Sequence, residues 1–325
     1  MSPAKTVLVT GAAGFIGSHS AAALLRRGDT VVGLDNLNDY YDPVRKRANL
    51  AEIEAGPGSN RFRFVHGDIR DRRLVEELFS GTRFDAIVHL AAMAGVRASI
   101  DDPWLYSDVN LTGTLNLLDA TARHGKPNFV FASTSSAYGN TKVIPFVESD
   151  TADRPLAPYP ASKRAAELMG HSYHHIQGVD FTALRFFTVY GPRGRPDMMA
   201  FKVLESIRVG REVPLYNNGQ MHRDWTFVDD IVAGVVAAAD VRLGYEIVNL
   251  GRGEPVLLAD FVQAIEELAG KKARLVPAPM MDADVAFTRA DVTKANRLLG
   301  YSPRISVGDG VRAFYEWYQS AIAAK

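Results

Sequence analysis

A tyrosine and a lysine stand four residues apart in the segment Tyr159-Pro160-Ala161-Ser162-Lys163. On a helix, this spacing places both side chains on the same face. An ammonium group beside a phenol stabilises the phenolate, so it lowers the pKa of the tyrosine and makes it a usable base near neutral pH. Such pairs are also common on helix surfaces, so the pair is informative only if a substrate can reach it.

A run of hydroxyl residues in the segment 131–139 indicates where a substrate could reach the pair. Ser133, Thr134, Ser135 and Ser136 follow one another at the end of a strand-like run. In parallel sheets, ligands bind in the crevice outside the carboxyl ends of the strands. A Thr or Ser hydroxyl at that place can hold the substrate oxygen that Tyr159 deprotonates.

Three glycines near the start of the chain predict a phosphate-binding turn. A strand-like run over residues 6–9 leads into Gly11, Gly14 and Gly17, and an Ala-rich helical segment over 14–27 follows. Such a turn needs a tight bend, a backbone bare enough to approach a pyrophosphate, and close packing of helix on strand. The helix N-terminus then offers free N–H groups to the phosphates. A glycine-rich turn without a ligand is the alternative, and the strand–turn–helix context argues against it.

Asp35 indicates which dinucleotide binds. It ends the second strand-like run, about 20 residues beyond the glycines, where a carboxylate accepts hydrogen bonds from the adenosine ribose hydroxyls. The same carboxylate would repel a 2′-phosphate, and Asn36 rather than an arginine follows it, so we predict NAD and not NADP. Asp68 ends the third run and either faces the adenine or caps the next helix.

The glycine turn, Asp35 and the hydroxyl run can form one site only if a parallel sheet brings the ends of their strands to the same edge. Short β-branched runs alternate with helical patterns, which predicts an α/β fold: a Rossmann-type, doubly wound parallel sheet with a smaller, discontinuous substrate-binding lobe. We expect an NAD-binding domain over residues 1–187 plus 226–250, and a second domain over 188–225 plus 251–325. The expected strands are 6–9, 30–34, 61–66, 86–90, 129–133, 181–187 and 245–250; the expected helices include 14–27, 71–79, 104–124 and 227–239.

Composition excludes several kinds of chemistry. The chain has 325 residues with 37 Lys+Arg and 37 Asp+Glu, so charge gives no reason to expect nucleic acid or a membrane surface as partner. It has no cysteine, which excludes disulfides, thiolate metal sites and cysteine nucleophiles. His171 and His175 have the spacing of a zinc pair but lack a third ligand, so we predict no metal site. With no signal-peptide pattern at the N-terminus, we expect a cytoplasmic protein.

With these motifs in place, the chain resembles the extended short-chain dehydrogenases/reductases, in their nucleotide-sugar epimerase and dehydratase group. The resemblance covers essentially the whole chain. It implies that Thr134, Tyr159 and Lys163 are catalytic. It also implies that the cofactor-binding residues are Gly11, Gly14, Phe15, Ile16, Gly17, Asp35, Asn36, Asp68, Ile69, Leu90, Ala91, Ala92, Asn110, Tyr159 and Lys163.

Within that group, the chain is most similar to the UDP-glucuronate 4-epimerases. The similarity rests on the segments 94–97, 184–192 and 194–198, the last reading Gly-Arg-Pro-Asp-Met. Related dehydratases and decarboxylases carry acids after the active-site threonine, whereas this chain has Ser135 and Ser136, which cannot act as general acids or bases near neutral pH. The resemblance therefore implies oxidation at C4 of UDP-glucuronate, turnover of the 4-keto sugar, and reduction to UDP-galacturonate.

A 4-keto uronate is a β-keto acid, which loses CO2 unless its carboxylate is held. We assign that role to Arg195, because a guanidinium–carboxylate pair fixes orientation as well as charge. Arg193 is the second choice, with a place near the cofactor as its other possible role, and a solvated loop charge is the alternative for both. The resemblance also places Arg223 at the diphosphate. Tyr216 either stacks on the uracil or is an ordinary packed tyrosine. The full set expected to bind substrate is Arg97, Ser135, Ser136, Thr188, Arg195, Tyr216 and Arg223.

Two other functions remain open at this stage. A 4-epimerase of a neutral UDP-hexose, including its N-acetyl form, would not need the loop 194–197. An NAD-binding regulator without catalysis would keep the fold but usually loses the Tyr–Lys pair or the hydroxyl, and all three groups are present here.

Epimerases of this group often carry an Arg-x-Gly-Asp segment near residues 281–284; its Arg and Gly are absent, so we assign no diphosphate contact there. The group's members pair through two helices, so we expect a homodimer.

Overall fold

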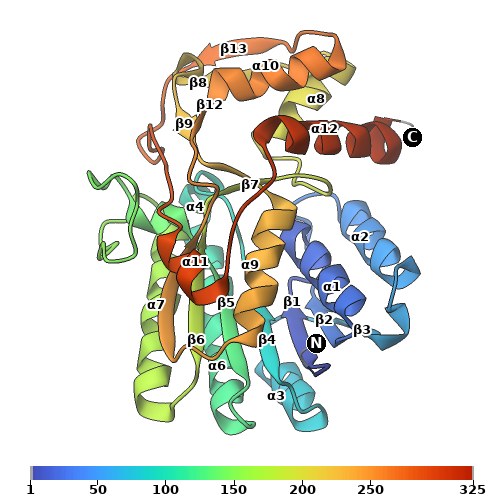
Figure 1. The fold of residues 1–325 in the computed structure, drawn as a ribbon, viewed down its shortest axis with the longest axis vertical. Helices are drawn as coiled ribbons and strands as arrows, with labels where there is room; N and C mark the ends of the chain where they lie inside the picture. The colour runs from blue at the N-terminus through green and yellow to red at the C-terminus, as the bar shows by residue number, and fades with distance from the viewer. Residues whose placement is uncertain (1–2, 324–325) are drawn as a thin grey trace.

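The computed structural model describes residues 3–323, and its centre is a sheet of seven parallel strands (Figure 1). The strand order is β11-β6-β5-β4-β1-β2-β3, so the order reverses between β1 and β4, which is where a doubly wound sheet opens its ligand crevice. This confirms the predicted Rossmann-type fold. The strands are β1 (Thr6–Thr10), β2 (Thr30–Asp35), β3 (Phe62–His66), β4 (Ala86–His89), β5 (Asn128–Thr134), β6 (Phe181–Phe186) and β11 (Tyr245–Leu250).

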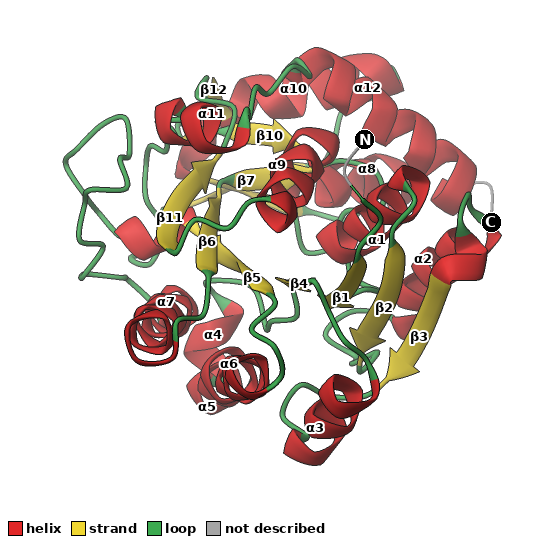
Figure 2. Cartoon of the chain, turned by 60° about the horizontal axis from the view of Figure 1, so that its bottom comes forward, coloured by secondary structure: helices red, strands yellow, loops and turns green. Residues whose placement is uncertain are grey.

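Helices cover both faces of the sheet, as Figure 2 shows. Along β1, Val7 and Val9 belong to one hydrophobic core and Leu8 to the other, because successive strand residues point to opposite faces. Both faces of the central strands are buried, which explains why strands such as β1 and β4 read as continuous apolar runs. One face carries α1 (Phe15–Arg27) and α9 (Val228–Asp240); the other carries α3 (Arg72–Gly81), α6 (Gly113–Arg123) and α7 (Pro158–Gln177).

Beyond the carboxyl ends of the strands lies a smaller group of elements, at the top of Figure 1. It contains three two-stranded sheets and the helices that pack on them. Its elements are β7 (Thr188–Tyr190), β8 (Val213–Tyr216), β9 (His222–Arg223), β10 (Trp225–Phe227), β12 (Val256–Leu257), β13 (Leu275–Ala278), α8 (Met199–Val209), α10 (Leu258–Ala269) and α12 (Val307–Tyr318). The division of the chain at residues 187, 225 and 250 stays a prediction.

Four further α-helices lie in the described part of the chain. α2 (Pro43–Ala55) lies beside α1, and α4 (Ala98–Asp101) and α5 (Pro103–Ser107) lie beside α7. α11 (Thr293–Leu299) packs against β11 and α9. Among residues 3–323, none of the helices combines the length and the apolar character needed to cross a membrane.

The expected helix over 104–124 contains an irregular turn. A π-helical turn spans Asp108–Thr112, between α5 and α6. Asn110 lies in this turn with its side chain inside the protein, where Oδ1 accepts from Met93 N at 2.8 Å and Nδ2 donates to Met93 O at 2.9 Å. Thr114 Oγ1 donates to Asn110 O at 2.6 Å. Side-chain hydrogen bonds thus compensate the altered backbone pairing, a feature that apolar periodicity does not reveal.

Candidate active site

A crevice runs along the carboxyl ends of β1 to β6 and collects most of the residues that the sequence singles out. Loops that follow each of these strands contribute to its lining. The topology therefore brings together motifs that are far apart in the chain, as expected for the switch point of such a sheet. The expected residues that line it are Gly11, Gly14, Phe15, Ile16, Gly17, Asp35, Asn36, Asp68, Ile69, Leu90, Ala91, Ala92, Thr134, Ser135, Ser136, Tyr159, Lys163, Thr188 and Arg195.

The glycine turn packs as tightly as the sequence predicts. Gly11 has φ +71°, and a Cβ there would lie 2.7 Å from Ala91 N. A Cβ on Gly17 would lie 1.9 Å from Gly11 O. Gly14 precedes α1, and no side chain caps this helix, so its first-turn N–H groups face the crevice without a side-chain acceptor. Such a bare helix start suits a pyrophosphate.

The acidic residues at the ends of β2 and β3 line the same crevice. Asp35 accepts backbone hydrogen bonds from Ala13 N at 3.1 Å and Leu37 N at 2.8 Å, while burial raises its pKa. Asp68 accepts from Asn36 Nδ2 at 2.8 Å and from Arg70, which lowers its pKa to about 2 although burial opposes this. The alternative role of Asp68 as a helix cap is wrong, because Asp71 caps α3.

The proposed catalytic groups meet between β5 and α7. Tyr159 and Lys163 lie in the first two turns of α7, and Thr134 is the last residue of β5. Burial raises the pKa of Tyr159, and hydrogen bonding with Thr134 and the charge of Arg195 act against this rise. The sequence predicted that Lys163 would lower this pKa; instead, the groups that act on the phenol are Thr134 and Arg195.

Lys163 is buried without a hydrogen-bond partner among the described residues. Its Nζ lies 4.1 Å from the centroid of the Phe131 ring, and only 1% of the residue is exposed. Burial lowers its pKa to about 7, and the nearby Glu167 opposes the shift. A buried ammonium without an acceptor is costly, so this group is suited to a ligand with hydroxyl oxygens, such as a dinucleotide ribose. With the glycine turn and Asp35, the residues present therefore fit NAD.

Arg195 reaches the crevice from the loop between β7 and α8, and it already has a protein partner. Its Nε donates to Asp197 Oδ1 at 2.9 Å, and its Nη2 donates to Asp197 Oδ2 at 2.6 Å. Arg193, the second choice for the carboxylate, is not among the residues that line the crevice, and it forms an ion pair with Glu52 of α2. Of these two arginines, only Arg195 lines the crevice.

Three other expected substrate residues form a separate cluster. Arg97 lies over the ring of Tyr216, 3.6 Å from its centroid, and its Nη2 bonds Asp284 Oδ2 at 2.7 Å. Burial lowers the pKa of Arg223 to about 10; Asp284 raises this pKa and Arg97 lowers it further. These residues do not line the crevice itself, but Gly95 and Val96, just before Arg97, do. Sequence reasoning assigned nothing to Asp284, because the surrounding motif is incomplete.

Some residues that line the crevice were missed, and one of the expected cofactor-binding residues lies outside the lining. Tyr40, Tyr41 and Lys46 come from the loop and helix after β2, and Lys46 Nζ donates to Asn38 Oδ1 at 2.6 Å. Two consecutive tyrosines shortly after Asp35 were the signal that could have found them. Asn110 is fully buried and uses its amide on Met93, as described above, so its contact with a cofactor stays a prediction. No group of three potential metal ligands occurs among the described residues.

A doubly wound sheet, a bare glycine turn, Asp35 and the Thr134–Tyr159–Lys163 group define an NAD-dependent extended short-chain dehydrogenase/reductase. The chain belongs to the NAD dependent epimerase/dehydratase family, whose model matches residues 7–251. It is therefore an enzyme, and the alternative of an NAD-binding regulator without catalysis is wrong.

Relatives across the family are similar over nearly the whole chain. A UDP-glucuronate 4-epimerase from Thermodesulfobacterium geofontis is 42% identical, covering 97% of this chain and 96% of its own. UDP-glucuronate 4-epimerase 4 from Arabidopsis thaliana is 43% identical over 97% of this chain and 75% of its own. The structure of UDP-glucuronic acid 4-epimerase from Bacillus cereus, with UDP-glucuronic acid and NAD, has a TM-score of 0.90 at 34% identity and covers 97% of this chain and 99% of its own. UDP-glucose 4-epimerase from Thermotoga maritima, with UDP-glucose, has a TM-score of 0.88 at 30% identity and covers 98% of this chain and 99% of its own.

Proposed function

We propose that the protein is a UDP-sugar 4-epimerase that interconverts UDP-glucuronate and UDP-galacturonate. The observation that carries the uronate assignment is the place of Arg195, which lines the same crevice as Tyr159 and acts on the pKa of its phenol. A neutral sugar offers a guanidinium at that place only hydroxyl oxygens, whereas a C6 carboxylate offers a charged partner that can accept two parallel hydrogen bonds. The relatives named for UDP-glucuronate support the same choice.

In this proposal, Tyr159 accepts the proton of the sugar O4 and Thr134 holds that oxygen. NAD, when bound, supplies the capacity to accept a hydride from C4 and to return it to the opposite face. Lys163 binds the nicotinamide ribose, which gives its buried ammonium the acceptors that the protein does not provide. Ser135 and Ser136 bind the sugar without exchanging protons, because neither hydroxyl is acidic or basic enough near neutral pH.

The nucleotide part of the substrate would lie at the cluster of Arg97, Tyr216 and Arg223. Two arginines and one carboxylate, Asp284, leave this cluster with a net positive charge, which suits a diphosphate. One face of Tyr216 is covered by Arg97, so a uracil would stack on the other face. Thr188, the first residue of β7, lines the crevice and can reach the sugar.

Replacing Arg195 tests the uronate assignment. For Arg195→Ala, we expect binding of UDP-glucuronate to weaken by about 2–5 kcal/mol, because a desolvated ion pair is lost. Binding of UDP alone should hardly change, and some turnovers should end as CO2 and a 4-keto-pentose. Arg193→Ala is the matched control, because Arg193 pairs with Glu52 outside the crevice. If Arg195→Ala binds UDP-glucuronate normally and forms only the C4 epimer, the carboxylate is held elsewhere.

A neutral UDP-hexose is the second candidate substrate. The similarity to UDP-glucose 4-epimerase from Thermotoga maritima favours it. Incubating the protein with UDP-glucuronate, UDP-glucose, an N-acetylated UDP-hexose and UDP-xylose, and separating the products, decides between the two. Epimerisation of UDP-glucose or its N-acetyl form without activity on UDP-glucuronate would contradict the uronate assignment.

We also propose a homodimer formed through α5 and α7. Trp104 on α5 is 84% exposed and Leu168 on α7 is 55% exposed, and the two helices lie side by side. Apolar side chains that gather on one face of a molecule mark an interaction surface, and a two-fold axis pairs such a face with itself. Analytical ultracentrifugation tests this: Trp104→Glu should shift the protein toward the monomer.

A further inference from the structure

Asp197 is the nearest anionic partner of Arg195, and a tight turn fixes the two residues relative to each other. Met198 N donates to Arg195 O at 3.1 Å, which closes a turn with Pro196 at its second position. Proline at that position holds the backbone in the turn conformation. The two hydrogen bonds from Arg195 to Asp197 therefore join side chains that the backbone already holds together.

The pair leaves one edge of the guanidinium available. Asp197 takes the edge formed by Nε and Nη2. The other edge, formed by Nη1 and the second hydrogen of Nη2, makes no hydrogen bond within the described part of the chain, and the side chain keeps 21% of its surface exposed beside the crevice. A carboxylate can still bind this second edge through two parallel hydrogen bonds.

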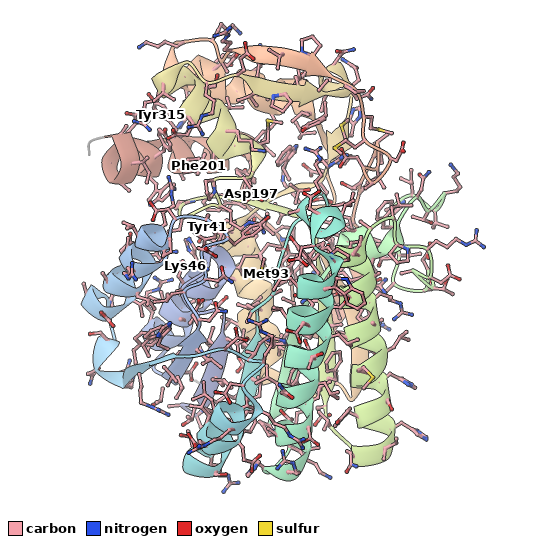
Figure 3. All side chains as sticks on the ribbon, turned by 180° about the vertical axis from the view of Figure 1, so that it is seen from behind. Tyr41, Lys46, Met93, Asp197, Phe201 and Tyr315 are labelled. Carbon is pink, nitrogen blue, oxygen red and sulfur yellow. The ribbon has the colours of Figure 1, made fainter. Side chains whose placement is uncertain are left out.

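Tyr40 connects this pair to the cofactor-binding part of the protein. Its hydroxyl donates to Asp197 Oδ2 at 3.4 Å, and its ring lies 5.6 Å from Arg195 Cζ. Tyr40 belongs to the loop that follows Asp35, and a Cβ on Gly95 would lie 2.6 Å from its hydroxyl. In Figure 3, the Asp197 label stands between those of Tyr41 and Phe201, at the junction of the large sheet and the smaller group of elements.

We propose that Asp197 is a positioning residue, which fixes the edge of Arg195 that meets the substrate carboxylate and so keeps the 4-keto intermediate from losing CO2. This inference rests on the proposed function. Loss of CO2 breaks the C5–C6 bond, and its electron pair moves toward the C4 carbonyl to form an enolate, which takes a proton from water at C5. The breakage requires that bond to stand parallel to the carbonyl π orbitals. A guanidinium held on one edge keeps the carboxylate out of that orientation.

Each lost CO2 also leaves a measurable trace. The hydride taken from C4 is not used to form the epimer, so one bound cofactor stays reduced for each 4-keto-pentose released. The ratio of CO2 and reduced cofactor to UDP-galacturonate therefore reports the orientation of the carboxylate. A change that only loosens the fold lowers all rates together and leaves this ratio unmoved.

Asp197→Asn tests the proposal, with UDP-glucuronate as substrate. It keeps the size of the side chain but lets the guanidinium turn. We expect the ratio of CO2 to epimer to rise roughly tenfold or more, while the KM for UDP-glucuronate changes less than about threefold and the affinity for UDP is unchanged. Tyr40→Phe removes only the hydroxyl that donates to Asp197, and it should raise the ratio in the same direction by a smaller factor. Asp197→Glu should restore part of the wild-type ratio.

Glu52→Gln is the matched control, because Glu52 pairs with Arg193 of the same loop but away from the crevice. It should leave the ratio at the wild-type value. If Asp197→Asn binds UDP-glucuronate more tightly and forms only the epimer, Asp197 competes with the substrate and the proposal is wrong. If Asp197→Asn does not fold, an unchanged ratio in Tyr40→Phe overturns the proposal. If the wild-type protein does not epimerise UDP-glucuronate at all, the proposed function itself fails.

Discussion

Glu167 and Arg185 form an ion pair in which neither side chain has any exposed surface. Arg185 donates from Nε to Oε1 at 3.0 Å and from Nη2 to Oε2 at 2.8 Å. Glu167 also accepts from Ser133 Oγ and from Arg164 Nη1. It lies one helical turn after Lys163, and Ser133 directly precedes Thr134. The pair therefore ties the helix that carries Tyr159 and Lys163 to the ends of β5 and β6.

We expect Arg185→Met to lower the free energy of unfolding by about 3–5 kcal/mol, because it leaves a buried carboxylate without its main partner. Urea unfolding measures the loss. The matched control is Arg73→Met, which breaks the exposed pair between Arg73 and Glu77 on α3 and should barely move the unfolding midpoint. Similar losses in both variants would contradict the importance of the buried pair.

Lys163→Met should abolish epimerisation and stabilise the nucleotide-free protein. Burial lowers the pKa of Lys163 from 10.5 to about 7, so below pH 7 the folded state carries a buried charge that the unfolded state keeps in water. Each pKa unit corresponds to about 1.4 kcal/mol, so the lowering from 10.5 to about 7 sets an upper limit of about 5 kcal/mol for the gain below pH 7. The gain should shrink as pH rises toward 10.5, where the lysine is neutral in both states. A gain that is independent of pH would show that packing, not charge, is responsible.

Tyr159→Phe should lower kcat by at least about 10²–10⁴-fold, because the phenol oxygen is needed for proton transfer. Binding of the nucleotide sugar should survive, since the cluster around Arg223 is unchanged. Steady-state kinetics and calorimetric titration with UDP-glucuronate measure the two effects separately. Near-normal turnover in this variant would rule out Tyr159 as the base.

The purified protein should carry NAD+ or NADH without supplementation, because an epimerase regenerates its cofactor in each turnover and has no need to exchange it. Denaturing the protein and assaying the supernatant for nicotinamide nucleotides tests this. Strict dependence on added NADP+ would instead contradict the assignment of Asp35 to the adenosine ribose, because a carboxylate in that place would repel a 2′-phosphate.

Several features of this protein follow from short stretches of sequence. The glycine turn, Asp35 and the alternation of strands with helices are local patterns, and the structure places them as predicted, at most a few residues from the expected bounds. The spacing of Tyr159 and Lys163 needs only the geometry of one helix. That Thr134 meets them follows from the general rule that the ends of parallel strands share one edge.

Only the tertiary structure decides which partners the charged and polar side chains find. Asn110 turns inward to Met93 and lies outside the crevice lining, whereas Arg195 lines the crevice and donates from Nε and Nη2 to Asp197. Arg97 and Asp284 are 187 residues apart and still form an ion pair. Apolar burial follows a period that a sequence displays, whereas the partner of a charge depends on which loops the folded sheet brings to its edge, and no local pattern encodes that.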